Sequence, residues 1–259
     1  MLSLILLEYR KIFGFRSVRL ALIVLLILPW IWSFAPRLQE IYGLVLVSGW
    51  QVPSLALVTS AEFLLPIFIA VTSAELVGHE MSQGTLAPLL LRPVSRSRLL
   101  GAKLITALTY PVLLLLVLFA ASMLAGLRLG FGDFAGGTGL GAGAWVGQGM
   151  LTPGGAVAEL ARGYGLASLT LMPIAALAML FAVMYLNTAA AALGTIATLL
   201  LMRLLVVFPE GVQKLLLTSH FGAYLSQNPR DVQQSLLLLT IYTVGFTLLA
   251  LFTFERKDV

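Results

Sequence analysis

The chain has 259 residues, of which 59% are hydrophobic and only 10% are charged. Soluble domains carry about 25% charged residues, so this composition and the mean hydropathy of +1.00 indicate a protein that crosses a membrane several times. The net charge of +5 is interpreted as a mark of topology and lipid contact, not of nucleic-acid binding. The absence of cysteine excludes disulfides, thiolate catalysis and cysteine-ligated metals.

The first 17 residues predict a helix that lies in the membrane interface. Its charged residues Glu8, Arg10 and Lys11 fall mostly off one apolar face. That face contains residues at helical spacing: Leu2, Ile5, Leu6, Tyr9, Ile12 and Phe13. This pattern is typical of an amphipathic interfacial helix. The alternative is a simple N-terminal extension of the first membrane span.

Six later segments are long and apolar enough to cross a bilayer, which takes about 20 residues of helix. They are 18–35, 54–77, 104–126, 165–186, 188–208 and 235–254. We therefore predict an all-α membrane protein with one transmembrane domain over residues 1–259. Ten of the sixteen Lys and Arg residues lie in the N-terminal segment up to Arg19, in 78–103 or after the last span, five lie on the other side, and Arg203 falls inside a span. The positive-inside rule then puts both termini and segment 78–103 in the cytoplasm.

Segment 78–103 is a polar strip between two apolar spans. Gly84 can end the helix that leaves the second span, Thr85 can cap a short helix that starts at Leu86, and Pro93 stops it. We expect a short, stiff amphipathic helix across the membrane face. The alternative is a solvated loop whose cations only anchor to anionic lipid, with Glu80 paired to Arg96 or Arg98 as ordinary surface charge.

The same strip resembles the signature E-x-x-x-G-T … L-L-x-x-P-V-x-R … G-x-K of type-2 ABC transporter permeases. The matching residues are Glu80, Gly84-Thr85, Leu89-Leu90, Pro93-Val94, Arg96 and Gly101–Lys103. The resemblance implies a coupling helix that docks on a separate ATPase subunit, which would bind ATP and magnesium, while this chain carries no cofactor. With the neighbouring Arg98, the coupling residues are then Glu80, Gly84, Thr85, Leu89, Pro93, Arg96, Arg98 and Lys103. It also implies a second permease copy, as a homodimer or heterodimer.

The opposite side of the membrane carries larger connections. Residues 127–164 are rich in glycine, and we expect an external loop that either contacts an external accessory protein or serves as a plain linker. Residues 209–234 predict a short helix on the outer surface. On the cytoplasmic side, Asn187 and Thr188 predict a tight turn, with Asn187 as a left-handed helix C-cap and Thr188 as the next N-cap.

Two ionisable residues, Glu62 and Arg203, lie well inside spans, both in the outer half. Charge inside a membrane is costly and usually has a partner, so we hypothesise that they pair. The pair either lies on a translocation path or holds two helices together, and the two roles are compatible. Ala190, Gly194 and Thr198 form a small-residue stripe, which is either a dimer seam or packing within one chain.

We find no motif for catalysis. The two histidines lie outside any HExxH sequence, and neither GxSxG nor a GxxxxGK[ST] phosphate loop occurs. We therefore expect no catalytic or metal-binding residues. The resemblance implies the permease subunit of an ATP-driven ABC transporter in the cytoplasmic membrane, with export favoured over import. The alternatives are an ATP-independent channel or membrane scaffold, or a membrane-embedded enzyme.

Overall fold

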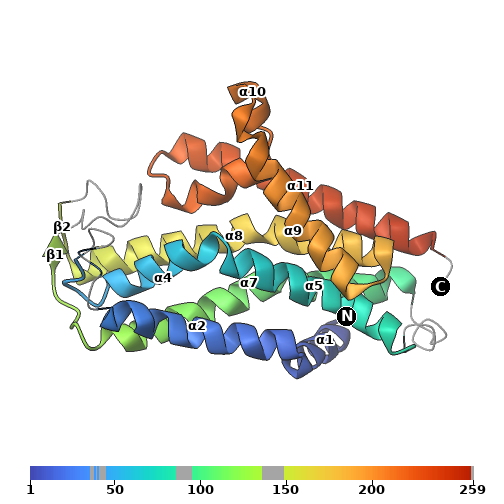
Figure 1. The fold of residues 1–259 in the computed structure, drawn as a ribbon, viewed down its shortest axis with the longest axis horizontal. Coiled ribbons are helices and arrows are strands. Elements are labelled where there is room, and N and C mark those ends of the chain that lie inside the picture. Colours follow the sequence, from blue (N-terminus) through green and yellow to red (C-terminus); the bar gives the residue numbers. More distant parts are fainter. Residues whose placement is uncertain (36–37, 39, 41–44, 86–94, 136–148, 258–259) are drawn as a thin grey trace.

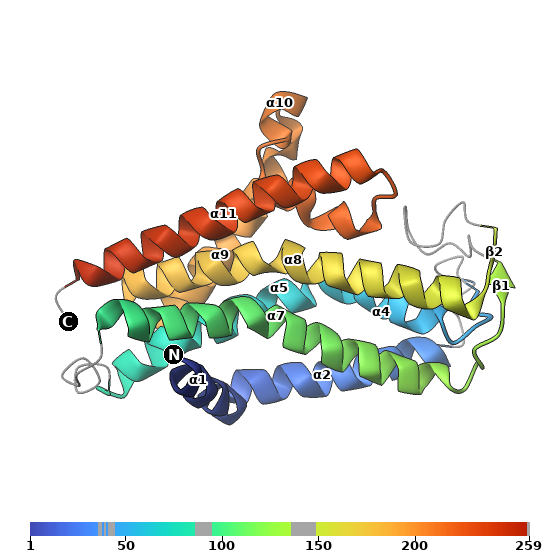
Figure 2. The ribbon, with the colours of Figure 1, turned by 180° about the vertical axis from the view of Figure 1, so that it is seen from behind.

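The structure is a computed structural model that describes residues 1–35, 38, 40, 45–85, 95–135 and 149–257. Long helices run side by side in a bundle, with a small antiparallel pair of strands at one end (Figures 1 and 2). The elements are α1 (Leu2–Gly14), α2 (Arg16–Phe34), α4 (Gln51–Ala61), α5 (Leu64–Ser82), α7 (Arg96–Gly126), β1 (Phe134–Ala135), β2 (Met150–Leu151), α8 (Pro153–Tyr185), α9 (Thr188–Leu204), η1 (Leu205–Val207), α10 (Glu210–Gln213), η2 (Leu217–Leu225) and α11 (Pro229–Glu255).

Within the described residues, six helical segments are long and apolar enough to cross a membrane. They are α2, α5, α7, α8, α9 with η1, and α11, and each one overlaps one of the six segments expected from the sequence. The chain is therefore a multi-pass, all-α membrane protein by length and composition. A break at Phe15 separates α1 from α2, since its ψ of 138° is extended, so α1 is a helix of its own.

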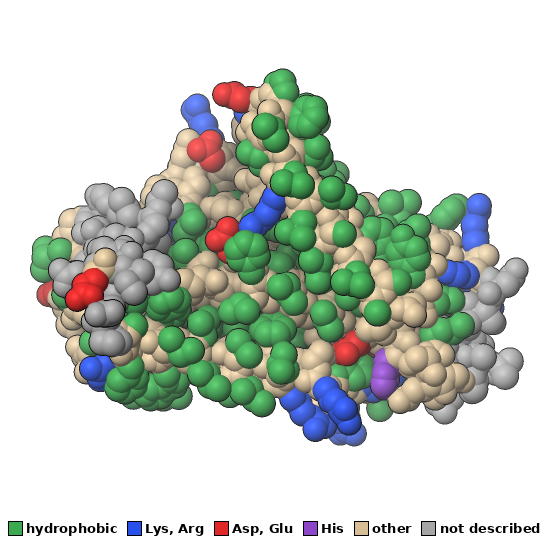
Figure 3. Space-filling view, viewed as in Figure 1, with side chains coloured by type: hydrophobic (Ala, Val, Ile, Leu, Met, Phe, Trp, Pro, Cys, Tyr) green, Lys and Arg blue, Asp and Glu red, His purple; other side chains and the backbone are tan. Residues whose placement is uncertain are grey.

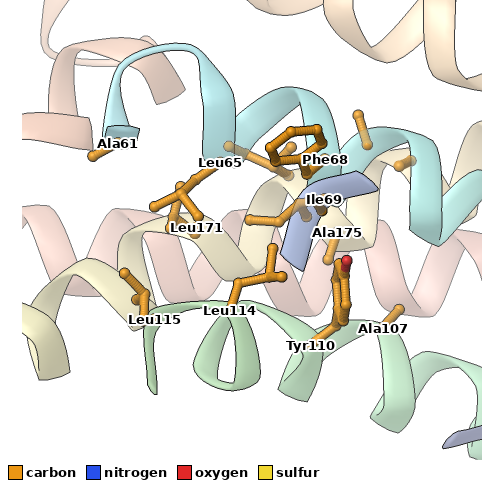
Figure 4. Packing of buried hydrophobic residues seen from close by; sticks show 14 of the residues in the cluster. Ala61, Leu65, Phe68, Ile69, Ala107, Tyr110, Leu114, Leu115, Leu171 and Ala175 are labelled. Atoms are coloured by element: carbon orange, nitrogen blue, oxygen red, sulfur yellow. The ribbon is translucent and has the colours of Figure 1, made fainter. Parts of the chain in front are cut away.

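Helix α8 forms the centre of the bundle. It packs against α5, α7, α9 and α11, and its buried face is rich in alanine. Figure 4 shows Leu65 and Ile69 of α5 and Leu114 of α7 around Leu171 of α8, and Tyr110 of α7 pointing toward Ala175. Because lipid is as apolar as these side chains, such helices are held by close packing and interhelical hydrogen bonds more than by hydrophobic burial.

Two boundaries differ from the sequence expectation. Helix α8 begins at Pro153 instead of residue 165, so residues 153–164 are helical and not part of an external loop. Thr152 caps this start, because its hydroxyl accepts a hydrogen bond from the Gly155 amide at 3.4 Å and Pro153 occupies the first turn. The second span is interrupted at Glu62 and Phe63, which separate α4 from α5. The most glycine-rich part, 136–148, lies outside the described residues.

The turn between α8 and α9 is shifted by one residue from the expectation. Leu186, not Asn187, has the left-handed conformation, with φ of 51°. Asn187 instead caps α9, since its side-chain oxygen accepts a hydrogen bond from the Ala190 amide at 3.0 Å. The outer segment 209–234 also differs, because it folds into two short helices, α10 and η2, before α11 begins at Pro229.

Gly78 of α5 lies directly against the start of α9. A Cβ atom built on Gly78 would come within 2.5 Å of the Thr188 amide nitrogen and 2.8 Å of its Cα. Real Cβ atoms do not approach backbone so closely, so α5 and α9 touch at this point only because residue 78 has no side chain.

We expect Gly78→Ala to destabilise the protein by about 1–3 kcal/mol, the usual cost of overpacking. The measurement is thermal unfolding of the purified protein in a single detergent. Gly165→Ala is the matched control, because a Cβ at Gly165 in α8 would meet nothing within 4 Å. Equal melting temperatures for the two variants would contradict the close α5–α9 contact.

Candidate functional site

Four charged residues meet at the end of the bundle that carries α1, the last turns of α5 and the first turns of α7. We call this end the base and name Glu8, Lys11, Glu80 and Lys103 the basal charge cluster. Three of the four are buried: Lys103 is 1% exposed, Glu8 3% and Glu80 6%. Charged residues are almost never so deeply buried without a partner, so their contacts determine what the base can do.

The ammonium of Lys103 is fully satisfied. Its Nζ donates to Glu80 Oε1 at 2.7 Å, to the Leu76 carbonyl at 2.8 Å and to Glu8 Oε2 at 3.0 Å. A lysine ammonium has three donors, and all three are used. Lys103 therefore joins α7 to α1 through Glu8 and to α5 through Glu80 and Leu76.

Lys11 forms a second bridge across the same carboxylates. Its Nζ lies 2.8 Å from Glu8 Oε1 and 2.7 Å from Glu80 Oε1. Partial burial by itself would lower the pKa of Lys11, but the hydrogen bonds and charges of Glu8 and Glu80 outweigh it and raise the pKa above its ordinary value. Lys11 is thus charged at neutral pH, and two cations balance two carboxylates. Glu80 Oε2 is buried without a hydrogen bond among the described residues.

The sequence singled out Glu80 and Lys103 but missed Glu8 and Lys11. The amphipathic pattern of the first helix put its charges mostly off the apolar face, whereas Glu8 faces the bundle together with Ile12, which lies one turn further on. The apolar residues Leu2 and Leu6 are exposed instead. A local signal existed, because a buried Ile four residues after a Glu places both on one helix face.

Glu80 also closes the last turn of α5, next to the expected coupling helix. The Glu80 carbonyl accepts hydrogen bonds from the Thr85 amide at 2.9 Å and the Thr85 hydroxyl at 3.2 Å. Gly84 ends the helix in the left-handed region, with φ of +66°, which favours glycine. The coupling residues Leu89 and Pro93 lie outside the described residues.

Arg96 and Arg98 do not pair with Glu80, in contrast to the surface-charge alternative. The Glu80 carboxylate is taken by two lysines, and Arg98 is exposed. Arg96 Nη1 donates to the Lys257 carbonyl at 2.8 Å. Lys257 in turn donates its ammonium to the Val183 carbonyl at 2.9 Å and to that of Met184. Lys257, two residues after the end of α11, thus ties the start of α7 to the end of α8.

Glu62 and Arg203 form an ion pair at the break between α4 and α5. Arg203 Nη1 lies 3.2 Å from Glu62 Oε1, and Nη2 donates to the Glu62 carbonyl at 3.1 Å. The guanidinium also stacks 4.7 Å from the ring centre of Phe63. The Glu62 side chain is 60% exposed and that of Arg203 32%, so the pair lies on the outside of this single chain and links α9 to the interrupted span.

The small-residue stripe on α9 is only partly used within the chain. A Cβ on Gly194 would lie 3.5 Å from the Phe181 ring and 3.7 Å from that of Tyr185, so Gly194 packs against the end of α8. Ala190 is exposed and Thr198 is half-buried. The role of the stripe as a dimer seam stays a prediction.

The fold and the basal charge cluster define a multi-pass helical membrane protein whose base is joined by buried ion pairs. The chain belongs to the family described as "Protein of unknown function (DUF2705)", whose model matches residues 20–259. It is also similar to a protein described as "Uncharacterized protein YhcI" from Bacillus subtilis (strain 168), with 43% identity over 70 residues. This match covers 26% of the present chain and 22% of the relative, so it spans about a fifth of the relative's length.

We expect Lys103→Met to destabilise the protein by about 3–5 kcal/mol, because it leaves two buried carboxylates short of a cation. Adding Glu8→Gln should recover part of the loss, since it removes one of those carboxylates. Unfolding of the single and double variants in the same detergent gives both values. Lys214→Met is the control, because Lys214 and Glu210 form a loose exposed pair at 3.9 Å that contributes at most about 1 kcal/mol. A double variant no more stable than Lys103→Met would contradict the direct Glu8–Lys103 coupling.

For the outer ion pair we expect Glu62→Arg and Arg203→Glu each to lower the melting temperature in lipid nanodiscs. Each single change leaves two like charges side by side within a membrane-spanning region. The double charge swap restores the attraction between the side chains and should recover part of the loss, since a glutamate at 203 cannot donate to the residue 62 carbonyl. A swap that does no better than either single variant would show that the two side chains do not interact.

Proposed function

We propose that this chain is the membrane subunit of an ATP-driven transporter of the type-2 ABC permease kind. It would work as a dimer of permeases with two ATPase subunits, to which residues 86–94 present a coupling helix. The motif resemblance in 78–103 is the starting point. The observation that carries the proposal further is the basal charge cluster, which joins α1 to both flanks of this segment.

The cluster gives the segment a way to act on the membrane helices. Glu80 lies on α5 just before residues 86–94, and Lys103 lies on α7 just after them. Because Lys103 bonds both to Glu80 of α5 and to Glu8 of α1, a force applied to the segment reaches three helices at once. A loop that is only anchored to lipid would not need a buried lysine with three hydrogen bonds, such as Lys103, in the helix that follows it. The presence of Lys103 there favours the coupling role.

In this proposal the base faces the cytoplasm and the protein lies in the cytoplasmic membrane. The ten cations at the termini and in 78–103 support this topology through the positive-inside rule. Helix α1 would lie in the interface, in agreement with the outward exposure of Leu2, Leu6 and Phe13. Glu62 and Arg203, on the outside of one protomer, would face the second copy along the translocation path. Export is favoured, since the chain shows no feature for docking a substrate-binding protein.

The proposal is tested by purifying the tagged chain from its native membranes in mild detergent and identifying co-purifying proteins by mass spectrometry. We expect an ATPase with a phosphate loop to co-purify and to be lost in a Leu89→Asp, Arg98→Glu double variant. Arg98 is exposed, and Glu80 is left intact so that the base still folds. Arg230→Glu, an exposed change outside the base, is the control and should retain the ATPase. Absence of any ATPase from the native sample would favour a channel or scaffold.

A further inference from the structure

Three arginines gather where α1 meets α2. Arg10 lies near the end of α1, and Arg16 and Arg19 lie in the first turn of α2. All three are exposed, and none forms an ion pair within the part of the chain that the structure describes. We call them the arginine elbow. Figure 3 shows Lys and Arg side chains grouped along the lower edge of the molecule, over this junction.

The nearby carboxylates leave this positive charge uncompensated. Glu8 and Glu80 are neutralised by the two lysines of the basal charge cluster. Glu75 of α5 accepts the hydroxyl of Ser17, on the side of α2 that faces the bundle. Helix α2 also has no acidic residue in its first turn and no side-chain cap, so its free amide groups add to the positive potential at the elbow.

The surface beyond the elbow shows what kind of anion fits. Along the exposed face of α2, Arg16 and Arg19 are followed by Leu20, Ile23 and Ile27, each more than half exposed. Helix α2 is one of the six segments apolar enough to span a membrane. A change from exposed arginine to exposed aliphatic residues on one helix face marks the boundary between lipid headgroups and hydrocarbon.

We propose that the arginine elbow binds the headgroup phosphate of an anionic phospholipid whose acyl chains lie along Leu20 and Ile23 of α2. Guanidinium groups suit phosphate because they donate two parallel hydrogen bonds. Arg19 already holds the bend, by donating to the Gly14 carbonyl at 3.3 Å, whereas Arg10 and Arg16 make no side-chain hydrogen bond among the described residues and are free for the lipid. This assignment does not depend on the transport proposal.

Lipid binding at the elbow would also brace the basal charge cluster. Helix α1 exposes Leu2, Leu6, Leu7 and Phe13. Besides the contacts of Glu8 and Lys11, the buried Ile12 and a hydrogen bond between Tyr9 and Thr109 hold it on the bundle. A bound headgroup fixes Arg10 of α1 to Arg16 of α2 and so limits the freedom of Glu8 to leave Lys103. The stability of the base should therefore rise with the fraction of anionic lipid.

The test uses nanodiscs of phosphatidylcholine with a small fraction of photoactivatable phosphatidylglycerol, and maps cross-links by proteolysis and mass spectrometry. We expect cross-links to residues 10–27 that fall about fivefold for each arginine removed, as for cations at an anionic membrane surface. The variant is Arg10→Gln with Arg16→Gln, because neither side chain supports the fold. The matched control, Lys214→Gln with Arg230→Gln, removes two exposed cations elsewhere and should leave these cross-links unchanged.

Equal cross-linking of the elbow in both double variants would overturn the assignment. So would equal cross-linking by a photoactivatable phosphatidylcholine, since the proposed site requires net negative charge. Displacement of the lipid by millimolar glycerol phosphate would show a site for soluble phosphate instead. In discs of phosphatidylcholine alone, the Arg10→Gln, Arg16→Gln variant should have the same melting temperature as the native protein. A lower melting temperature of the variant there would show that Arg10 and Arg16 stabilise the fold and do not bind lipid.

Discussion

The base of this protein depends on the ammonium of Lys103. Lys103 is only 1% exposed, and its ammonium donates all three of its hydrogen bonds, to Glu8, Glu80 and the Leu76 carbonyl. A buried charge is tolerated only when such partners replace its hydration. Each acceptor comes from outside α7, so Lys103 can be satisfied only when α1 and α5 are both in place. The position of α1 therefore follows from an electrostatic requirement in addition to the burial of Ile12.

The rest of the bundle is held by close packing, in which the size of side chains matters more than their hydrophobicity. In lipid, apolar burial gives little net drive for helices to associate. Helix α8 accordingly presents alanines such as Ala175 and Ala178 to its neighbours, and Gly78 lets the start of α9 touch α5. Polar bonds add specificity at chosen points, as between Tyr164 and the Pro53 carbonyl at 2.9 Å.

The six spans could be predicted because length and hydropathy determine them directly. The ends of the spans could not be predicted, because each end depends on a balance between the helix propensity of the local residues and the capping and packing contacts that they form. At residues 153–165 the glycines suggest a loop, but the cap at Thr152 and the packing of the helix outweigh the low helix propensity of glycine. The break at Glu62 and Phe63 precedes Pro66 of α5, which has no N–H to donate to the Glu62 carbonyl four residues earlier. Instead, Arg203 bonds to the Glu62 carbonyl, so a residue distant in sequence stabilises the interruption.

Two of the four residues of the basal charge cluster could be predicted from the sequence, and two could not. Glu80 and Lys103 belong to one continuous motif, whereas Glu8 lies 95 residues from Lys103. Nothing local to α1 shows that a cation from α7 will reach it. Amphipathic analysis assigns charged residues to the helix face that points away from the protein. This assignment fails where a buried residue of opposite charge lies on the inner face. A buried pair between distant segments is therefore the feature that sequence reasoning of this kind is least able to find.

The polar contacts at the base also indicate where it can move. The basal charge cluster joins α1, α5 and α7, and Lys257 joins the end of α11 to the last carbonyls of α8. In the described residues, one polar contact at the base links these two blocks: the hydrogen bond from Arg96 to the Lys257 carbonyl. Breaking such a bond costs about 1.5–3 kcal/mol, whereas pulling Lys103 away from its carboxylates costs about 3–5 kcal/mol. By their polar contacts, α1, α5 and α7 are therefore joined to one another at the base more strongly than they are joined there to α8 and α11.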